Sequence, residues 1–164
     1  YHALTWLQEN EQYIPDVVVQ LRPTYPIRKS QDIDNMVELL LKHPEADSVR
    51  SMAKATEIPY KMWLLKDSEI MLSEEKNQQL PGEEKGAATG QIIPLINDIP
   101  ECYNMPRQQL PVVYYQNACI DVFRPAVVLE KHSMSGDYIL GYEMSENYDI
   151  DTEEDFERAM QAMR

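Results

Sequence analysis

The clearest pattern of apolar and polar positions lies between residues 30 and 44. Its apolar residues recur at the three- and four-residue spacing of one helix face: Ile33, Met36, Val37, Leu40 and Leu41. Ser30 comes before this stripe and can cap a helix, whereas Pro44 comes after it and cannot continue one. The pattern therefore predicts an amphipathic helix between these two residues.

A short apolar run, Val17–Val19 with Leu21, precedes this helix and predicts a buried strand in a helix-covered parallel sheet. The run ends in Arg22–Arg28 (RPTYPIR), a loop that two prolines stiffen and two arginines flank. Ligands of open α/β sheets bind beyond the carboxyl ends of the strands, so this loop is a candidate anion site. The alternative is a surface loop whose arginines are only solvated.

The rest of the chain alternates further helices and strands. We expect a helix over residues 1–12 and strands over 47–53 and 58–65. Residues 112–123 are either one strand or two strands with a break at Asn117–Ala118, and a short helix over 126–131 and a strand over 138–144 follow. Strand, loop and helix in succession form a βα unit, and this order predicts an α/β fold. Lys61 is a lone cation among apolar residues, and is either a ligand contact or a side chain that extends to water.

Residues 66–106 differ in composition from the rest of the chain. They are charged and rich in turn-forming residues, with one apolar cluster over residues 92–96. Such a segment does not suit the interior of a sheet, so we expect a loop, an arm or a partner-binding flap. The alternative is a flexible surface insertion. We place the α/β core at residues 1–58 and 107–164, and the excursion at residues 59–106.

Two carboxylates near the C-terminal end form a candidate cation site. Asp149 and Asp151 are two positions apart, so in an extended chain both side chains point to the same face. Magnesium is held by one or two carboxylates together with phosphate oxygens and waters. Thr152 then caps a helix with an acidic first turn. The alternative is a solvated aspartate pair before that helix.

Composition narrows the classes of partner. Among 164 residues, 28 acidic against 15 basic side chains give a formal charge of −13, which argues against nucleic acid or an anionic membrane as the main partner. The two cysteines lack metal-ligand spacing and read as free thiols. The sequence shows no signal-type leader and no apolar run of transmembrane length, and we expect a cytoplasmic protein. Basic residues in stiff loops and the aspartate pair together predict a site for a nucleoside triphosphate or a phosphorylated sugar.

Three stretches of the chain carry a resemblance to a known family. They are residues 21–28 (LRPTYPIR) followed by Asp32–Asp34, residues 107–117 (RQQLPVVYYQN) and residues 148–159 (YDIDTEEDFERA). In this order they resemble the motifs LQPTSPLR or LRPTSPLR with an acidic helix start, RQxLPxxYxxNGAIY and IDIDTxxDFxxAE. These motifs belong to the acylneuraminate cytidylyltransferases, or CMP-sialic acid synthetases, and the likeness covers nearly the whole chain.

The resemblance implies a fold, a reaction and a set of site residues. The fold is a Rossmann-like nucleotidyltransferase sheet, with the excursion as a dimerisation arm. The anomeric hydroxyl of a nonulosonic (sialic-type) sugar acid attacks the α-phosphate of CTP, and pyrophosphate leaves. Asp149 and Asp151 match the Mg²⁺-binding pair and, with Arg107, are the expected catalytic residues. The expected substrate-binding residues are Arg22, Thr24, Arg28, Lys61, Gln108 and Asn117.

Departures from the motifs leave alternatives open. Arg22 stands where many members have glutamine, Tyr25 replaces a small serine, Ala118 a glycine and Asp121 a tyrosine. The acceptor is therefore sialic acid or another sugar acid, such as legionaminic acid, pseudaminic acid or Kdo. The family begins with a glycine-rich CTP-binding loop that has no match here, so we expect the central and C-terminal part of such an enzyme. A non-catalytic dimeric module is the alternative from another functional class.

Overall fold

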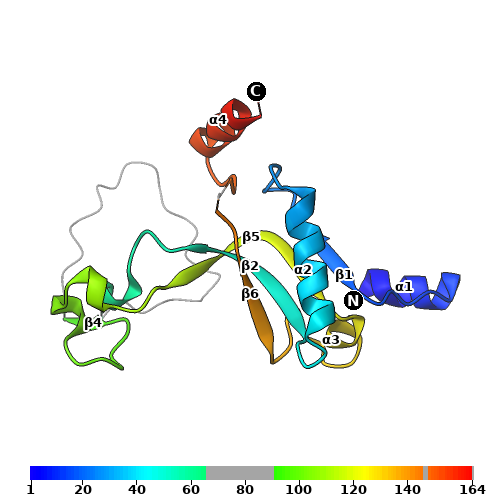
Figure 1. The fold of residues 1–164 in the computed structure, drawn as a ribbon, viewed down its shortest axis with the longest axis horizontal. Coiled ribbons are helices and arrows are strands. Elements are labelled where there is room, and N and C mark those ends of the chain that lie inside the picture. The colour runs from blue at the N-terminus through cyan, green and yellow to red at the C-terminus, as the bar shows by residue number, and fades with distance from the viewer. Residues whose placement is uncertain (66–90, 146–147, 164) are drawn as a thin grey trace, which may run out of the picture. The chain divides into compact units, whose positions relative to one another are not determined.

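The computed structural model describes residues 1–65, 91–145 and 148–163, and these divide into two compact units (Figure 1). The first, which we call the sheet unit, comprises Tyr1–Lys54 and Tyr114–Arg164. The second, the hairpin unit, comprises Ala55–Val113. The excursion expected over residues 59–106 lies within the hairpin unit, and its residues 66–90 lie outside the described part of the chain.

The sheet unit is built on a four-stranded sheet with the order β1-β5-β2-β6. These strands are β1 (Val18–Leu21), β5 (Tyr114–Phe123), β2 (Ser48–Lys54) and β6 (Ile139–Glu143). β1 and β2 both pair antiparallel to β5, whereas β2 and β6 pair parallel. The sheet is therefore open and mixed, and the fold is α/β in the broad sense. The expectation of a parallel sheet is wrong, because β5 lies between β1 and β2 and runs antiparallel to both.

β1 is less buried than its apolar sequence predicts. Among the described strands it pairs only with β5, so it lies at an edge, and Leu21 at its end is exposed. β5 carries the buried run instead, over residues 119–123. Because β5 lies between β1 and β2 and both of its faces are covered, its sequence shows no alternation there.

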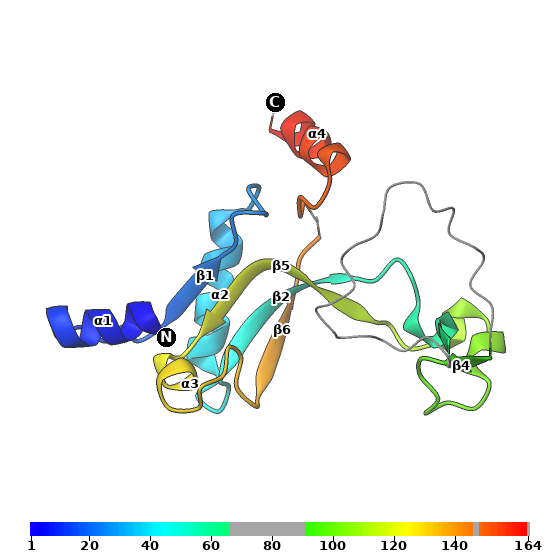
Figure 2. The same ribbon diagram turned by 180° about the vertical axis from the view of Figure 1, so that it is seen from behind.

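α2 (Ser30–Lys42) covers one face of the sheet, as Figures 1 and 2 show from opposite sides. Its Met36 and Leu40 are fully buried in a core with Val49 of β2 and Val122 of β5. The next residue along β5, Phe123, points to the other face. There it packs with side chains from α1 (His2–Glu11) and α3 (Pro125–Leu129), namely Leu4, Val128 and Leu129.

The N-terminal end of α2 differs from the sequence expectation, whereas its C-terminal end comes before Pro44 as expected. Lys29 occupies the N-cap position and no side chain caps it, so Ser30 is the first helical residue rather than the cap. At the other end, Arg124 donates hydrogen bonds from Nε to the Ala46 carbonyl (3.0 Å) and from Nη2 to the Leu40 carbonyl (2.9 Å). A cation there satisfies carbonyls that the helix leaves unpaired and favours the negative end of its dipole.

The described residues of the hairpin unit form one antiparallel strand pair, β3 (Trp63–Leu65) with β4 (Ile92–Pro94). The strand expected over residues 58–65 is wrong for its first half, because Pro59–Lys61 form a 3-10 turn with proline at its start. Two more 3-10 turns follow, at Cys102–Asn104 and Arg107–Gln109. Among all described helices, including α4 (Glu153–Ala162), none is long and apolar enough to cross a membrane.

Candidate functional site

The loop that follows β1, which we call the proline loop (residues 22–29), folds back on itself. The backbone N–H of Tyr25 donates to the Arg22 carbonyl at 3.2 Å, which makes a tight turn over Pro23 and Thr24. Arg28 donates from Nη2 to the carbonyls of Arg22 and Tyr25. Part of the Arg28 guanidinium is thus committed to holding the loop closed, while the Thr24 side chain is exposed.

Tyr25 anchors the proline loop in the core. It is fully buried among residues that include Met36, Leu40 and Cys119. Burial raises the pKa of Tyr25 to about 12, although a hydrogen bond with the Tyr148 backbone acts to lower it. The phenol therefore stays protonated at neutral pH and fills space that a serine would leave empty.

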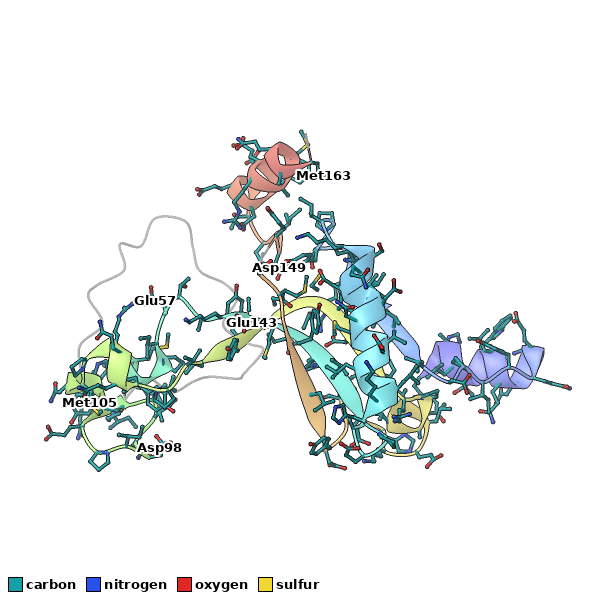
Figure 3. All side chains as sticks on the ribbon, viewed as in Figure 1. Glu57, Asp98, Met105, Glu143, Asp149 and Met163 are labelled. Carbon is teal, nitrogen blue, oxygen red and sulfur yellow. The ribbon has the colours of Figure 1, made fainter. Side chains whose placement is uncertain are left out.

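The segment Tyr148–Asp151, which we call the aspartate segment, lies against the proline loop. The backbone N–H of Ile150 donates to the Thr24 carbonyl at 2.9 Å, which joins segments 126 positions apart. Figure 3 labels Asp149 on this segment, between β6 and α4. Asp149 is half-buried, and its Oδ1 is a buried oxygen that makes no hydrogen bond within the described residues. Asp151 is exposed.

The helix after the aspartate segment begins as its sequence predicts. Thr152 accepts from the Asp155 backbone N–H at 3.2 Å, and Asp155 accepts from the Thr152 backbone N–H at 3.1 Å. This reciprocal pair is a capping box. The pKa of Asp155 is lowered, mainly by the hydrogen bond from the Thr152 hydroxyl and further by backbone N–H groups. Burial acts in the opposite direction but does not cancel these effects. The box fixes where α4 begins and hence where the aspartate segment ends.

A second polar group, which we call the Asp121 cluster, consists of Arg22, Arg50, Gln116 and Asp121. Asp121 is a buried residue on β5, and its Oδ1 accepts from Arg50 Nε of β2 at 3.0 Å. Its Oδ2 is 3.7 Å from Arg22 Nη2 at the end of β1. Arg50 also donates from Nη1 to Gln116 Oε1 at 3.0 Å. With two guanidinium groups and one carboxylate, the cluster has a formal surplus of one positive charge.

Asn117 belongs to a buried network rather than to an open surface. Its side chain is 1% exposed, and its Oδ1 accepts from Ser51 Oγ at 2.6 Å and from the Cys119 backbone N–H at 3.3 Å. The network supports an irregular step in β5, where the pairing with β2 shifts register and Ala118 takes φ 54°. The break predicted at Asn117–Ala118 is thus a bulge within one strand.

The remaining predicted residues belong to the hairpin unit. Lys61 donates from Nζ to the Tyr103 carbonyl at 3.0 Å and is half-buried. Arg107 is exposed, with Nη2 at 4.0 Å from Glu57 Oε2, and Gln108 is exposed as well. The two units thus divide the predicted site residues. Arg22, Thr24, Arg28, Asn117, Asp149 and Asp151 are in the sheet unit, and Lys61, Arg107 and Gln108 are in the hairpin unit.

A cavity of about 60 Å³ lies between the proline loop, the start of α2 and the aspartate segment. Its lining includes Tyr25, Arg28, Lys29, Asp32 and Tyr148. A cavity of this volume has room for only a few water molecules, so it cannot by itself enclose a nucleotide. Within the described part of the chain, no three His, Cys, Asp or Glu side chains gather as a metal-binding group.

The sequence prediction missed Arg50 and Gln116 as neighbours of Arg22. Arg50 and Asp121 are 71 positions apart, so no local spacing connects them. The available signal was a charged residue inside each of two apolar strands, because an isolated buried charge is costly unless it is paired. The sequence matches no protein-family model and no curated protein.

Proposed function

We propose that this chain belongs to a magnesium-dependent cytidylyltransferase that transfers CMP from CTP to a nonulosonic sugar acid. The anomeric hydroxyl oxygen forms a bond to the α-phosphorus, and the bond from that phosphorus to the pyrophosphate leaving group breaks. The observation that supports this proposal most is the hydrogen bond from Ile150 to Thr24. It brings together two motif-bearing segments that are far apart in the sequence, the proline loop and the aspartate segment.

Asp149 and Asp151 would hold the magnesium ion. The buried, unpartnered Oδ1 of Asp149 fits this role, because a buried carboxylate oxygen without a donor is costly unless a ligand satisfies it. An exposed second carboxylate two residues later suits an ion that keeps waters and phosphate oxygens in its shell. When bound, magnesium would supply charge neutralisation of the phosphates.

The other residues take separate roles in the proposal. Arg22 and Thr24, which are at the accessible side of the proline loop, contact the sugar acid or the nucleotide, and Arg28 keeps that loop closed. Arg107 stabilises the developing charge, and Lys61 and Gln108 bind substrate from the hairpin unit. Asn117 contributes through the bulge that it supports, since its amide is buried and hydrogen-bonded.

Two departures from the family motifs are paired with each other. Arg22 Nη2 lies 3.7 Å from Asp121 Oδ2, and Arg50 Nε donates to the other oxygen of the same carboxylate at 3.0 Å. Because both positions differ from the family motifs, the acceptor can differ from sialic acid as well. Legionaminic acid, pseudaminic acid and Kdo are therefore candidates beside sialic acid. The third departure, Tyr25, has a packing role, because its side chain is in the core.

The proposed enzyme is a homodimer with a Rossmann-like sheet, and residues 59–106 form its dimerisation arm. Exposed apolar side chains on both strands of the hairpin and on the residue before β3 support this part of the proposal: Met62, Trp63, Leu64, Ile92 and Ile93. Several exposed apolar side chains on one short hairpin are typical of a segment that a protein partner covers. Two free, buried cysteines fit a reducing compartment, and we propose the cytoplasm.

The transfer reaction itself tests the proposal. The full gene product that contains these residues is incubated with magnesium, CTP and each of the four sugar acids, and ³¹P NMR follows the conversion of CTP to a CMP phosphodiester and pyrophosphate. We expect product with one acceptor, and its loss in Asp151→Ala but not in Asp34→Ala, a matched exposed aspartate on α2. Absence of product with every acceptor contradicts the proposal and favours a non-catalytic module.

A further inference from the structure

The Asp121 cluster holds its two arginines unequally. Asp121 Oδ1 has a direct hydrogen bond from Arg50 Nε at 3.0 Å, whereas Arg22 Nη2 stands at 3.7 Å, beyond hydrogen-bond distance. Arg22 Nε is buried and makes no hydrogen bond within the described residues. The Arg22 guanidinium is therefore held near Asp121 by charge, and this contact uses none of its hydrogen-bond donors.

The more loosely held arginine is also the more exposed one. The Arg22 side chain is 41% exposed, compared with 26% for Arg50 and 7% for Asp121. Arg50 has two fixed partners, Asp121 and Gln116, so it is the arginine already committed within the protein. Arg22 is the one that solutes can reach, and a guanidinium with free donors binds carboxylate in a two-point geometry.

We propose that Arg50 is a positioning residue that keeps Arg22 available to bind the carboxylate of the acceptor sugar acid. By neutralising Asp121, Arg50 prevents that carboxylate from drawing Arg22 into a closed ion pair. This inference rests on the proposed function for the identity of the ligand. The chemistry at Arg22 itself requires only a carboxylate.

The charge of the cluster selects the kind of anion. Its surplus of one positive charge matches a monoanionic carboxylate. A phosphate with two negative charges would leave the group negative and would lie close to Asp121, where like charges repel. The terminal phosphate of a nucleotide, which carries two negative charges, is thus less favoured than a carboxylate at this position.

The test follows the side-chain ¹⁵N resonance of Arg22 Nε, assigned by its absence in Arg22→Met. Sodium glycolate serves as the probe, because it carries the carboxylate and neighbouring hydroxyl of a nonulosonic acid without the sugar. We expect a saturable shift with glycolate, a weaker response to inorganic phosphate, and none with sodium chloride at equal ionic strength. A glycolate response equal to that of chloride overturns the proposal, and tighter binding of phosphate reassigns the site to the nucleotide and overturns the carboxylate assignment.

Variants of Arg50 test its positioning role. Arg50→Gln should weaken glycolate binding by about fivefold, the effect of one partly exposed ion pair. Arg50→Lys should retain most of the affinity, and Arg50→Gln with Asp121→Asn should restore it, because the competing carboxylate is gone. Arg158→Gln, which removes an exposed arginine of α4, controls for charge alone and should leave binding unchanged.

Two results would overturn the role of Arg50: wild-type affinity in Arg50→Gln, or no recovery in the double variant when circular dichroism shows that both proteins are folded. The failure of this inference is distinguishable from the failure of the proposed function. If glycolate binds as expected but no CMP-sugar forms, the carboxylate site stands without the reaction. If CMP-sugar forms while the Arg22 resonance does not respond, the reaction stands and this site is wrong.

Discussion

The hydroxyl of Ser51 donates a 2.6 Å hydrogen bond to Oδ1 of Asn117, across 66 positions of sequence and in a fully buried setting. The same hydroxyl oxygen accepts from the Ile120 backbone N–H at 2.9 Å. These bonds satisfy the polar groups that the bulge at Ala118 takes out of the β2–β5 pairing. The pair therefore maintains the step in β5 on which the Asp121 cluster depends.

Ala118→Gly should stabilise the protein. Ala118 adopts φ 54°, a left-handed conformation that is unfavourable for a residue with a Cβ atom. Glycine removes this strain at the cost of a more flexible unfolded chain, so we expect a gain of about 0.5–1 kcal/mol in the free energy of unfolding. Urea denaturation measures it. Ala126→Gly, in α3, is the matched control and should destabilise, and equal losses in both variants would show that the bulge is not strained.

Thr152→Ala should loosen α4. The substitution removes the side-chain oxygen that accepts from Asp155, and loss of an N-cap costs about 1 kcal/mol of helix stability. Hydrogen exchange of the α4 amides reports the change. Ser30→Ala provides the contrast, because Ser30 is the first residue of α2 and not its cap, so the α2 amides should exchange as in the wild type. Faster exchange in α2 would restore the capping role that the sequence predicts.

Asp47 should make the free energy of unfolding fall at low pH. The hydrogen bond from Lys131, followed by those from the Asp137 and Tyr138 backbones, lowers the pKa of Asp47 from 3.8 to about 2. A carboxylate with a lowered folded-state pKa stabilises fully above its unfolded pKa, and this contribution is lost as the pH falls through the folded value.

Asp47→Asn measures this contribution. The difference in unfolding free energy between wild type and Asp47→Asn should be constant above pH 5 and should shrink between pH 3.8 and about 2. A difference that does not change with pH would mean that Asp47 acts through packing alone.

Leu64→Glu or Ile93→Glu should convert the proposed homodimer to a monomer. These residues face each other across β3 and β4, and each is 39% exposed. A buried glutamate at an apolar interface leaves an unpaired charge, which strongly weakens association. Light scattering after size exclusion gives the mass. Leu41→Glu, an exposed position on α2, should leave it unchanged, and a monomeric wild type would contradict the dimer.

The elements that the sequence predicts correctly are those with a local signal. The α2 stripe, the Thr152 cap and the break at Asn117–Ala118 each depend on residues within a few positions of one another. The features that the sequence did not predict depend on contacts between distant segments. Local residue spacing does not predict the antiparallel pairing of β5 with β1, nor the contact between Arg50 and Asp121, because each joins segments that are far apart in the sequence.

Side-chain roles were harder to predict than elements. Asn117 has the residue type of a substrate contact, but the bulge turns it into the interior, where the Ser51 hydroxyl and the Cys119 backbone N–H donate to its Oδ1. Arg28 sits in a loop suited to an anion, yet it donates to carbonyls of that loop. In both cases the backbone conformation decides which partner the polar group meets, and the residue type alone does not.

The most direct test of the central claim is a calorimetric titration of CTP, with magnesium, into the full gene product that contains these residues. We expect binding that requires magnesium and that disappears in Asp149→Ala, while Asp98→Ala binds as the wild type does. Absence of binding, or binding that Asp149→Ala leaves intact, would contradict a nucleotide–magnesium site at the aspartate segment.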